Sequence, residues 1–183
     1  IKFNWSNLYE EKLKIEFRNR YNGKYFLQSR NQPNIKVFNK NEISNLLNLD
    51  CLNKKIVCIF SPVLWDANLF YGHDIFNDFE DWLIETLRVA ITNTNVVWLL
   101  KLHPANIWKL KRSNLDPTIL SELEVINKEF GTLPNHIRIL NPDCGISTLS
   151  LFEFIDIGIT VRGTAGMELP CFGKTTLTAG TGR

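Results

Sequence analysis

The chain has 183 residues, of which 44% are hydrophobic and 22% charged, and its formal net charge is +2 at pH 7. These values are typical of a globular domain with a sizeable core. They argue against an acidic disordered chain and against a surface dedicated to nucleic acid. No apolar run reaches the roughly 18 residues that a membrane-spanning helix needs.

Residues 1–50 form a polar segment rich in Asn, Lys and Arg, with scattered aromatic side chains. The pattern predicts a helix from Leu8 to Arg20 and a shorter helix from Ile43 to Leu49. Because Ile1 is not an initiating Met, we interpret this segment as an extension that either covers a sheet edge or links to a preceding domain.

Residues 51–183 alternate between apolar strands and amphipathic helices. Short apolar runs without polar alternation are typical of strands buried on both faces. The pattern predicts strands at 56–60, 96–102, 137–140, 157–161 and 175–178, and helices at 75–92, 116–130, 147–154 and 163–172. Strands joined by helices predict an α/β fold: a Rossmann-like parallel sheet of about five strands with helices on both faces.

Polar residues gather where these expected strands end. In a parallel sheet such positions lie along one edge, where ligands bind. The residues concerned are Asp66 and His73 in a long loop after the first strand, His103 after the second, Asp143 after the third, and Arg162 after the fourth.

The segment after the fourth strand indicates a phosphate-binding turn. Gly163, Thr164 and Ala165 are small and open a helix, whose first backbone N–H groups can bind phosphate. Glu168, one turn further, is placed to accept hydrogen bonds from ribose hydroxyls. Thr181 and Gly182 follow the fifth strand, where they would face the sugar or the phosphates. The turn is not GxGxxG, which disfavours a dinucleotide oxidoreductase.

The four cysteines show neither a CxxC pair nor a spacing typical of metal ligands, so we expect no metal and no cofactor. Cys58 lies in an apolar strand and is expected to be a buried, reduced thiol. The sequence therefore predicts a cytoplasmic protein.

Four segments resemble the C-terminal half of GT-B glycosyltransferases, especially Kdo-transferase-like proteins of bacterial capsule and surface polysaccharide biosynthesis. They are the strand end Lys101-Leu102-His103-Pro104, the run Arg162 to Glu168, and the later Phe172-Gly173-Lys174 and Thr178 to Arg183. The resemblance covers about residues 55–183. It implies that this chain is the donor-binding half of an enzyme whose other half, and some further C-terminal helices, lie outside it.

The resemblance also implies roles for individual residues. Gly163, Thr164 and Ala165 would cradle the donor phosphates, and Glu168 would bind the ribose. Arg162 stands where many relatives have a small or polar residue, and it could pair with phosphate or an acidic sugar. The substrates would be a nucleotide-sugar donor and a saccharide or glycolipid acceptor. The full-length protein would work in the cytoplasm or peripherally at the inner face of the membrane.

Each of these residues also has a structural interpretation. Glu168 could complement the helix dipole, Arg162 could be a surface charge, and His103 could serve only the backbone. Lys101 could lie in the pocket or on an edge, and the Asn-Pro-Asp sequence before Cys144 is also a common turn. Two further functions stay open: a UDP-sugar 2-epimerase-like enzyme, and a non-catalytic module of a polysaccharide assembly or export complex.

Overall fold

The computed structural model describes residues 4–21, 36–49, 54–64, 75–114, 116 and 120–180. The chain divides into two compact units, residues 1–35 and 36–183. In the first unit, helix α1 (Asn7–Tyr21) confirms the predicted N-terminal helix, and Lys14 forms ion pairs with Glu10 and Glu11 at 2.9 and 3.1 Å. None of the described helices is both long and apolar enough to span a membrane.

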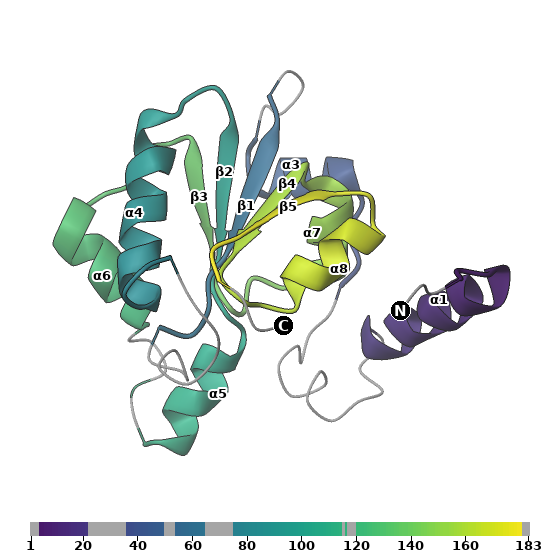
Figure 1. The fold of residues 1–183 in the computed structure, drawn as a ribbon. Helices are drawn as coiled ribbons and strands as arrows, with labels where there is room; N and C mark the ends of the chain where they lie inside the picture. Colours follow the sequence, from purple (N-terminus) through teal and green to yellow (C-terminus); the bar gives the residue numbers. More distant parts are fainter. Residues whose placement is uncertain are drawn as a thin grey trace. The chain divides into compact units, whose positions relative to one another are not determined.

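The second unit is built on a five-stranded parallel sheet (Figure 1). The strand order is β3-β2-β1-β4-β5, with β1 at the centre. The strands are β1 (Ile56–Phe60), β2 (Val97–Lys101), β3 (Ile137–Leu140), β4 (Ile157–Thr160) and β5 (Thr175–Thr178). The predicted Rossmann-like α/β fold is therefore confirmed.

Helices cover both faces of this sheet (Figure 1). One face carries α4 (Phe79–Thr92) and α6 (Ser121–Phe130), and the other carries α7 (Thr148–Phe154) and α8 (Ala165–Cys171). This distribution follows from right-handed crossovers, because the chain moves from β1 toward β3 on one side and from β4 toward β5 on the other. All five residues of β1 and of β2 are buried, as expected for central strands of a two-sided sheet.

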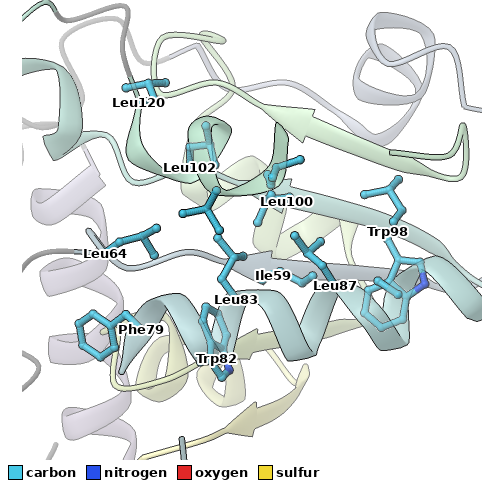
Figure 2. Packing of buried hydrophobic residues seen from close by; sticks show 14 of the residues in the cluster. Ile59, Leu64, Phe79, Trp82, Leu83, Leu87, Trp98, Leu100, Leu102 and Leu120 are labelled. Atoms are coloured by element: carbon cyan, nitrogen blue, oxygen red, sulfur yellow. The ribbon is translucent and has the colours of Figure 1, made fainter. Parts of the chain in front are cut away.

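The main hydrophobic core lies between β1, β2 and α4 (Figure 2). Leu83 and Leu87 of α4 are fully buried against Ile59 and Leu100 of the two strands. Each fully buried Leu or Ile side chain contributes about 1.5–3 kcal/mol of transfer free energy, so this layer fixes α4 on the sheet.

On the opposite face, an aromatic series links the sheet to its helices. The rings of Phe60 and Phe152 meet edge to face at 5.8 Å, and Phe172 lies 5.4 Å from Phe152. Helix α3 (Lys40–Leu46) packs with α7, and the Phe38 N–H donates to Ser150 Oγ at 2.9 Å. Residues 36–49 therefore pack with the sheet, whereas the sequence grouped them with the extension; a missing preceding domain remains a prediction.

Several element boundaries differ from the predicted ones. Helix α4 starts at Phe79 rather than Ile75, because the Asp78 carboxylate accepts the Asp81 N–H at 2.7 Å and caps the helix there. Helix α3 starts three residues earlier than predicted and ends at Leu46. Helix α8 has seven residues rather than ten. Helix α5 (Ala105–Arg112), beyond the carboxyl end of β2, was not predicted at all.

Candidate functional site at the carboxyl edge of the sheet

The strand order locates the site. The chain leaves β1 toward β2 and returns on the other side of β1 as β4, so the topological switch point lies between β1 and β4. Ser61 follows β1 there and is buried, with its N–H donating to the Lys101 carbonyl oxygen at 3.0 Å. The polar residues at the ends of β2 and β4 therefore flank the end of β1, roughly 10 Å apart in backbone position.

The turn after β4 is organised by Thr160. Its hydroxyl accepts the Gly163 N–H and donates to the Phe60 carbonyl oxygen, both at 3.3 Å, so it ties the turn to the end of β1. A Cβ at Gly163 would lie 2.8 Å from Thr160 Oγ1, which leaves room only for glycine. The Gly166 N–H donates to the Gly163 carbonyl oxygen at 2.9 Å. Of the three residues predicted to bind phosphate, Gly163 therefore has its N–H engaged within the turn.

Glu168 lies on α8 and is 8% exposed. A solvated carboxylate that only complements a helix dipole does not require burial, and Glu is rarely buried unless it is paired. Glu168 is therefore held inside the fold on the helix that follows the turn, rather than solvated at its surface. Its neighbour Met167 is half-exposed, so the helix turns Glu168 inward and Met167 outward.

Arg162 is half-buried and its guanidinium lies over the ring of Phe79, 5.6 Å from the ring centre. This contact joins the end of β4 to the first residue of α4. Nearby, the Ile75 N–H donates to the Ala179 carbonyl oxygen at 3.0 Å, at the end of β5. Arg162 is therefore held at the site edge rather than extended into solvent.

His103 follows β2 and has a defined local role. Its Nδ1 accepts the Ala105 N–H at 3.1 Å, and its carbonyl oxygen accepts the Asn106 N–H at 3.1 Å. The two bonds form the turn that starts α5. The Nδ1 atom of His103 therefore serves the backbone, as its structural interpretation predicted. A neutral ring that accepts this bond at Nδ1 carries its proton on Nε2.

A buried polar cluster underlies this edge. Asn106 Nδ2 donates to Glu122 Oε1 at 2.6 Å, and Ser121 Oγ donates to Glu122 Oε2 at 3.2 Å. The Ser61 hydroxyl donates to the Pro62 carbonyl oxygen at 3.0 Å and also lies close enough to the Glu122 carboxylate to favour its charged form. Burial is the larger effect and raises the pKa of Glu122 above its ordinary value. Sequence reasoning missed this cluster, since Ser61, Asn106 and Glu122 carry no local motif.

Lys101 lies neither on an edge nor at the surface. It is 6% exposed, and its ammonium donates to the Asn141 carbonyl oxygen at 3.0 Å and to Cys144 Sγ at 3.4 Å. The Cys144 N–H donates to the Asn141 carbonyl oxygen at 3.1 Å, so Asp143 is part of a turn. The structure supports the turn interpretation of Asp143 and gives Lys101 a role in holding that turn.

Four predicted site residues fall outside the described part of the chain: Asp66, His73, Thr181 and Gly182. Their roles remain predictions. The structure brings Arg162, Gly163, Thr164, Ala165 and Glu168 together on one strand, turn and helix, and places His103 on the other side of β1. Within the described ranges, no cluster of three or more His, Cys, Asp or Glu is positioned to bind a metal ion. Cys58 is free and buried, as predicted.

An apolar groove of about 340 Å³ opens elsewhere, between α4 and the β4–β5 part of the sheet. Its lining includes Phe76, Trp82, Trp98 and Leu177, and Glu85 is its charged residue. Among the described residues, neither a basic side chain nor a predicted site residue lines it.

The parallel sheet, its strand order and the position of the switch point define a Rossmann-like α/β fold. No family model matches the chain, and no curated protein matches it. Among solved structures, the fold is similar to that of MnaA from S. aureus, in a co-structure with UDP, with a TM-score of 0.51 and 14% sequence identity. The match covers 85% of this chain and 36% of the MnaA chain, so the chain spans about a third of that protein's length.

Proposed function

We propose that residues 36–183 form the nucleotide-sugar-binding domain of a GT-B-like enzyme, with UDP as the nucleotide. The observation that carries the proposal is the inward-facing Glu168, which is 8% exposed on the helix that follows the Gly163 turn at the switch point. The similarity to the fold of UDP-bound MnaA supports a nucleotide at this edge of such a sheet.

In this proposal Glu168 accepts hydrogen bonds from the ribose hydroxyls, and Arg162 and the Gly163–Ala165 turn bind the phosphates. An Arg guanidinium can bind phosphate through two parallel hydrogen bonds, and in a partly dry site this interaction stabilises the leaving diphosphate. The bond between Thr160 Oγ1 and the Gly163 N–H, at 3.3 Å, is long for a hydrogen bond, so this N–H can turn to a phosphate at little cost.

The finer activity is a glycosyl transfer in bacterial capsule or surface polysaccharide biosynthesis. Displacement at the anomeric carbon needs a base that removes the proton of the acceptor hydroxyl. We place this base on a part of the enzyme outside the 183 residues. The chain by itself is therefore expected to bind nucleotide weakly and to transfer no sugar.

Calorimetric titration of the chain with UDP, CMP and GDP tests the proposal. Saturable binding that is tightest for UDP supports it, whereas a folded chain that binds none of the three contradicts it. Tighter binding of CMP would retain a nucleotide site and reject UDP. A UDP-sugar epimerase would give the same nucleotide preference, and analysis of the sugar product of the full-length protein separates it from a transferase.

A further inference from the structure

The pair formed by Glu122 and Asn106 connects two elements that follow different strands. Asn106 lies in the first turn of α5, directly after the His103 turn, and Glu122 lies in the first turn of α6. Glu122 is fully buried and Asn106 is 2% exposed, and their side chains meet at 2.6 Å. A donor–acceptor distance this short is typical of a charge-assisted hydrogen bond.

Stability alone does not account for this pair. The Asn106 Oδ1 atom has no hydrogen-bond partner among the described residues, and within the same residues no cationic side chain bonds the Glu122 carboxylate. Unpaired polar atoms and buried charges both disfavour folding, and well-packed apolar residues in their place are often neutral or stabilising. Buried polar groups of this kind are better explained by the geometry that they impose.

The geometry that they impose is that of the His103 turn. Asn106 is the residue whose N–H closes the turn on the His103 carbonyl oxygen, while the Ala105 N–H bonds to His103 Nδ1. Glu122 belongs to α6, whose Val125 and Ile126 are buried in the main core. The chain of contacts therefore runs from the core through Glu122 and Asn106 to the His103 carbonyl oxygen, next to the Ala105 N–H that bonds the imidazole.

We propose that Glu122 and Asn106 are positioning residues for His103. They hold the turn in which His103 Nδ1 accepts the Ala105 N–H, and this bond fixes the ring in the tautomer that carries its proton on Nε2, which we call the tautomer lock. His103 then presents Nε2–H as a fixed donor at the carboxyl edge of the sheet. The tautomer lock concerns the chain without ligand, and only its consequence for UDP affinity rests on the proposed function.

Side-chain NMR of the 183-residue chain labelled with ¹⁵N-histidine tests this lock. The chain has three histidines, and His103→Gln identifies the resonances of His103. We expect the unmodified chain, at about two pH units above the ordinary His pKa, to show His103 as a single Nε2–H tautomer. His136 is an internal control, because its Nε2 lies 2.9 Å from the Ala90 carbonyl oxygen, far from the turn in sequence.

Glu122→Ala and Asn106→Ala should each convert His103 to a mixture of both tautomers and leave His136 unchanged. Glu122→Gln keeps an acceptor for Asn106 and should restore the single tautomer. Glu124→Gln, at an exposed position of the same helix, should have no effect on His103. If one of the two alanine variants does not fold, the other still tests whether the pair fixes the His103 tautomer.

Two results overturn the lock: an Nδ1–H tautomer of His103 in the unmodified chain, or an unchanged Nε2–H tautomer in both alanine variants. In UDP titrations, the same alanine variants should bind about tenfold more weakly than Glu124→Gln, the loss expected for about one displaced hydrogen bond. If the tautomers respond as expected but no variant binds UDP, the lock stands and the proposed function fails.

Discussion

Leu169 of α8 occupies the space in which a side chain at Gly158 of β4 would have to lie: a Cβ on Gly158 would overlap Leu169 Cδ1. The close approach brings α8 onto β4 and places Glu168, the neighbour of Leu169, at the carboxyl edge of the sheet. Gly166 supports the same contact, since a Cβ there would lie 3.1 Å from Thr178 Cγ2 and 3.2 Å from Thr160 Cγ2. The orientation of the candidate ribose-binding residue therefore depends on two small residues.

Gly158→Ala should lower the free energy of unfolding by about 1–3 kcal/mol, because it overpacks a site where Leu169 is fully buried. Urea denaturation measures this. In the double variant Gly158→Ala, Leu169→Ala the overlap is removed, so the combined loss should be smaller than the sum of the two single losses. Additive losses would mean that the two residues do not constrain each other.

Thr160→Val keeps the branched shape of the side chain and removes the hydroxyl that bonds both the Gly163 N–H and the Phe60 carbonyl oxygen. We expect a loss of about 1 kcal/mol in unfolding free energy, in line with buried hydrogen bonds elsewhere. Thr160→Ser retains the hydroxyl and is the matched variant. Equal stability of the valine variant and the parent chain would show that these 3.3 Å contacts do not hold the turn.

Asp156, just before β4, should make the fold sensitive to acid. Partial burial disfavours its charge, but the Ile56 N–H and the Lys55 ammonium outweigh this effect and hold the pKa of Asp156 below its ordinary value. A lowered pKa in the folded state gives stability that is present above the unfolded pKa and is lost as the pH falls through the folded one. In Asp156→Asn this acid-dependent loss should shrink, and the exposed Asp143→Asn should leave it unchanged. Denaturation curves between pH 7 and pH 3 provide the measurement.

Glu122 should change the stability with pH in the opposite direction to Asp156. Burial raises the pKa of Glu122, so its contribution to stability is greatest below the unfolded pKa and is lost as the pH rises through the folded one. Glu122→Gln removes this titration and keeps the acceptor for Asn106. We expect the variant to gain stability relative to the parent chain between pH 4 and pH 8. A constant difference across that range would contradict the assigned burial effect.

Strand positions could be predicted from the sequence more accurately than helix positions. The predicted limits of β1, β3 and β5 are confirmed. Helix α5 was missed because its segment is short and directly follows Pro104. The start of α4 was misplaced because the apolar spacing continues back to Phe76, whereas the cap at Asp78 makes the helix begin at Phe79.

In the candidate site, residues close together in the sequence could be predicted, whereas residues far apart could not. Gly163 and Glu168 could be found because they are close in sequence and form a recognisable turn and helix. Ser61, Asn106 and Glu122 could not, because they are up to 61 positions apart and meet only through the pairing of β1 with β2. Side-chain burial decided between the two interpretations that the sequence left open for Lys101, whereas the role of Glu168 remains a prediction.

The central claim is that the β4–α8 turn binds a nucleotide through Glu168. Titration of UDP against the parent chain and Glu168→Gln tests it most directly, with the exposed Glu124→Gln on α6 as the matched control. We expect saturable binding by the parent and the control, and at least about a tenfold loss in Glu168→Gln, since it loses the charge-assisted bonds to ribose. Equal UDP affinity of all three chains, each shown to be folded by circular dichroism, would contradict the account.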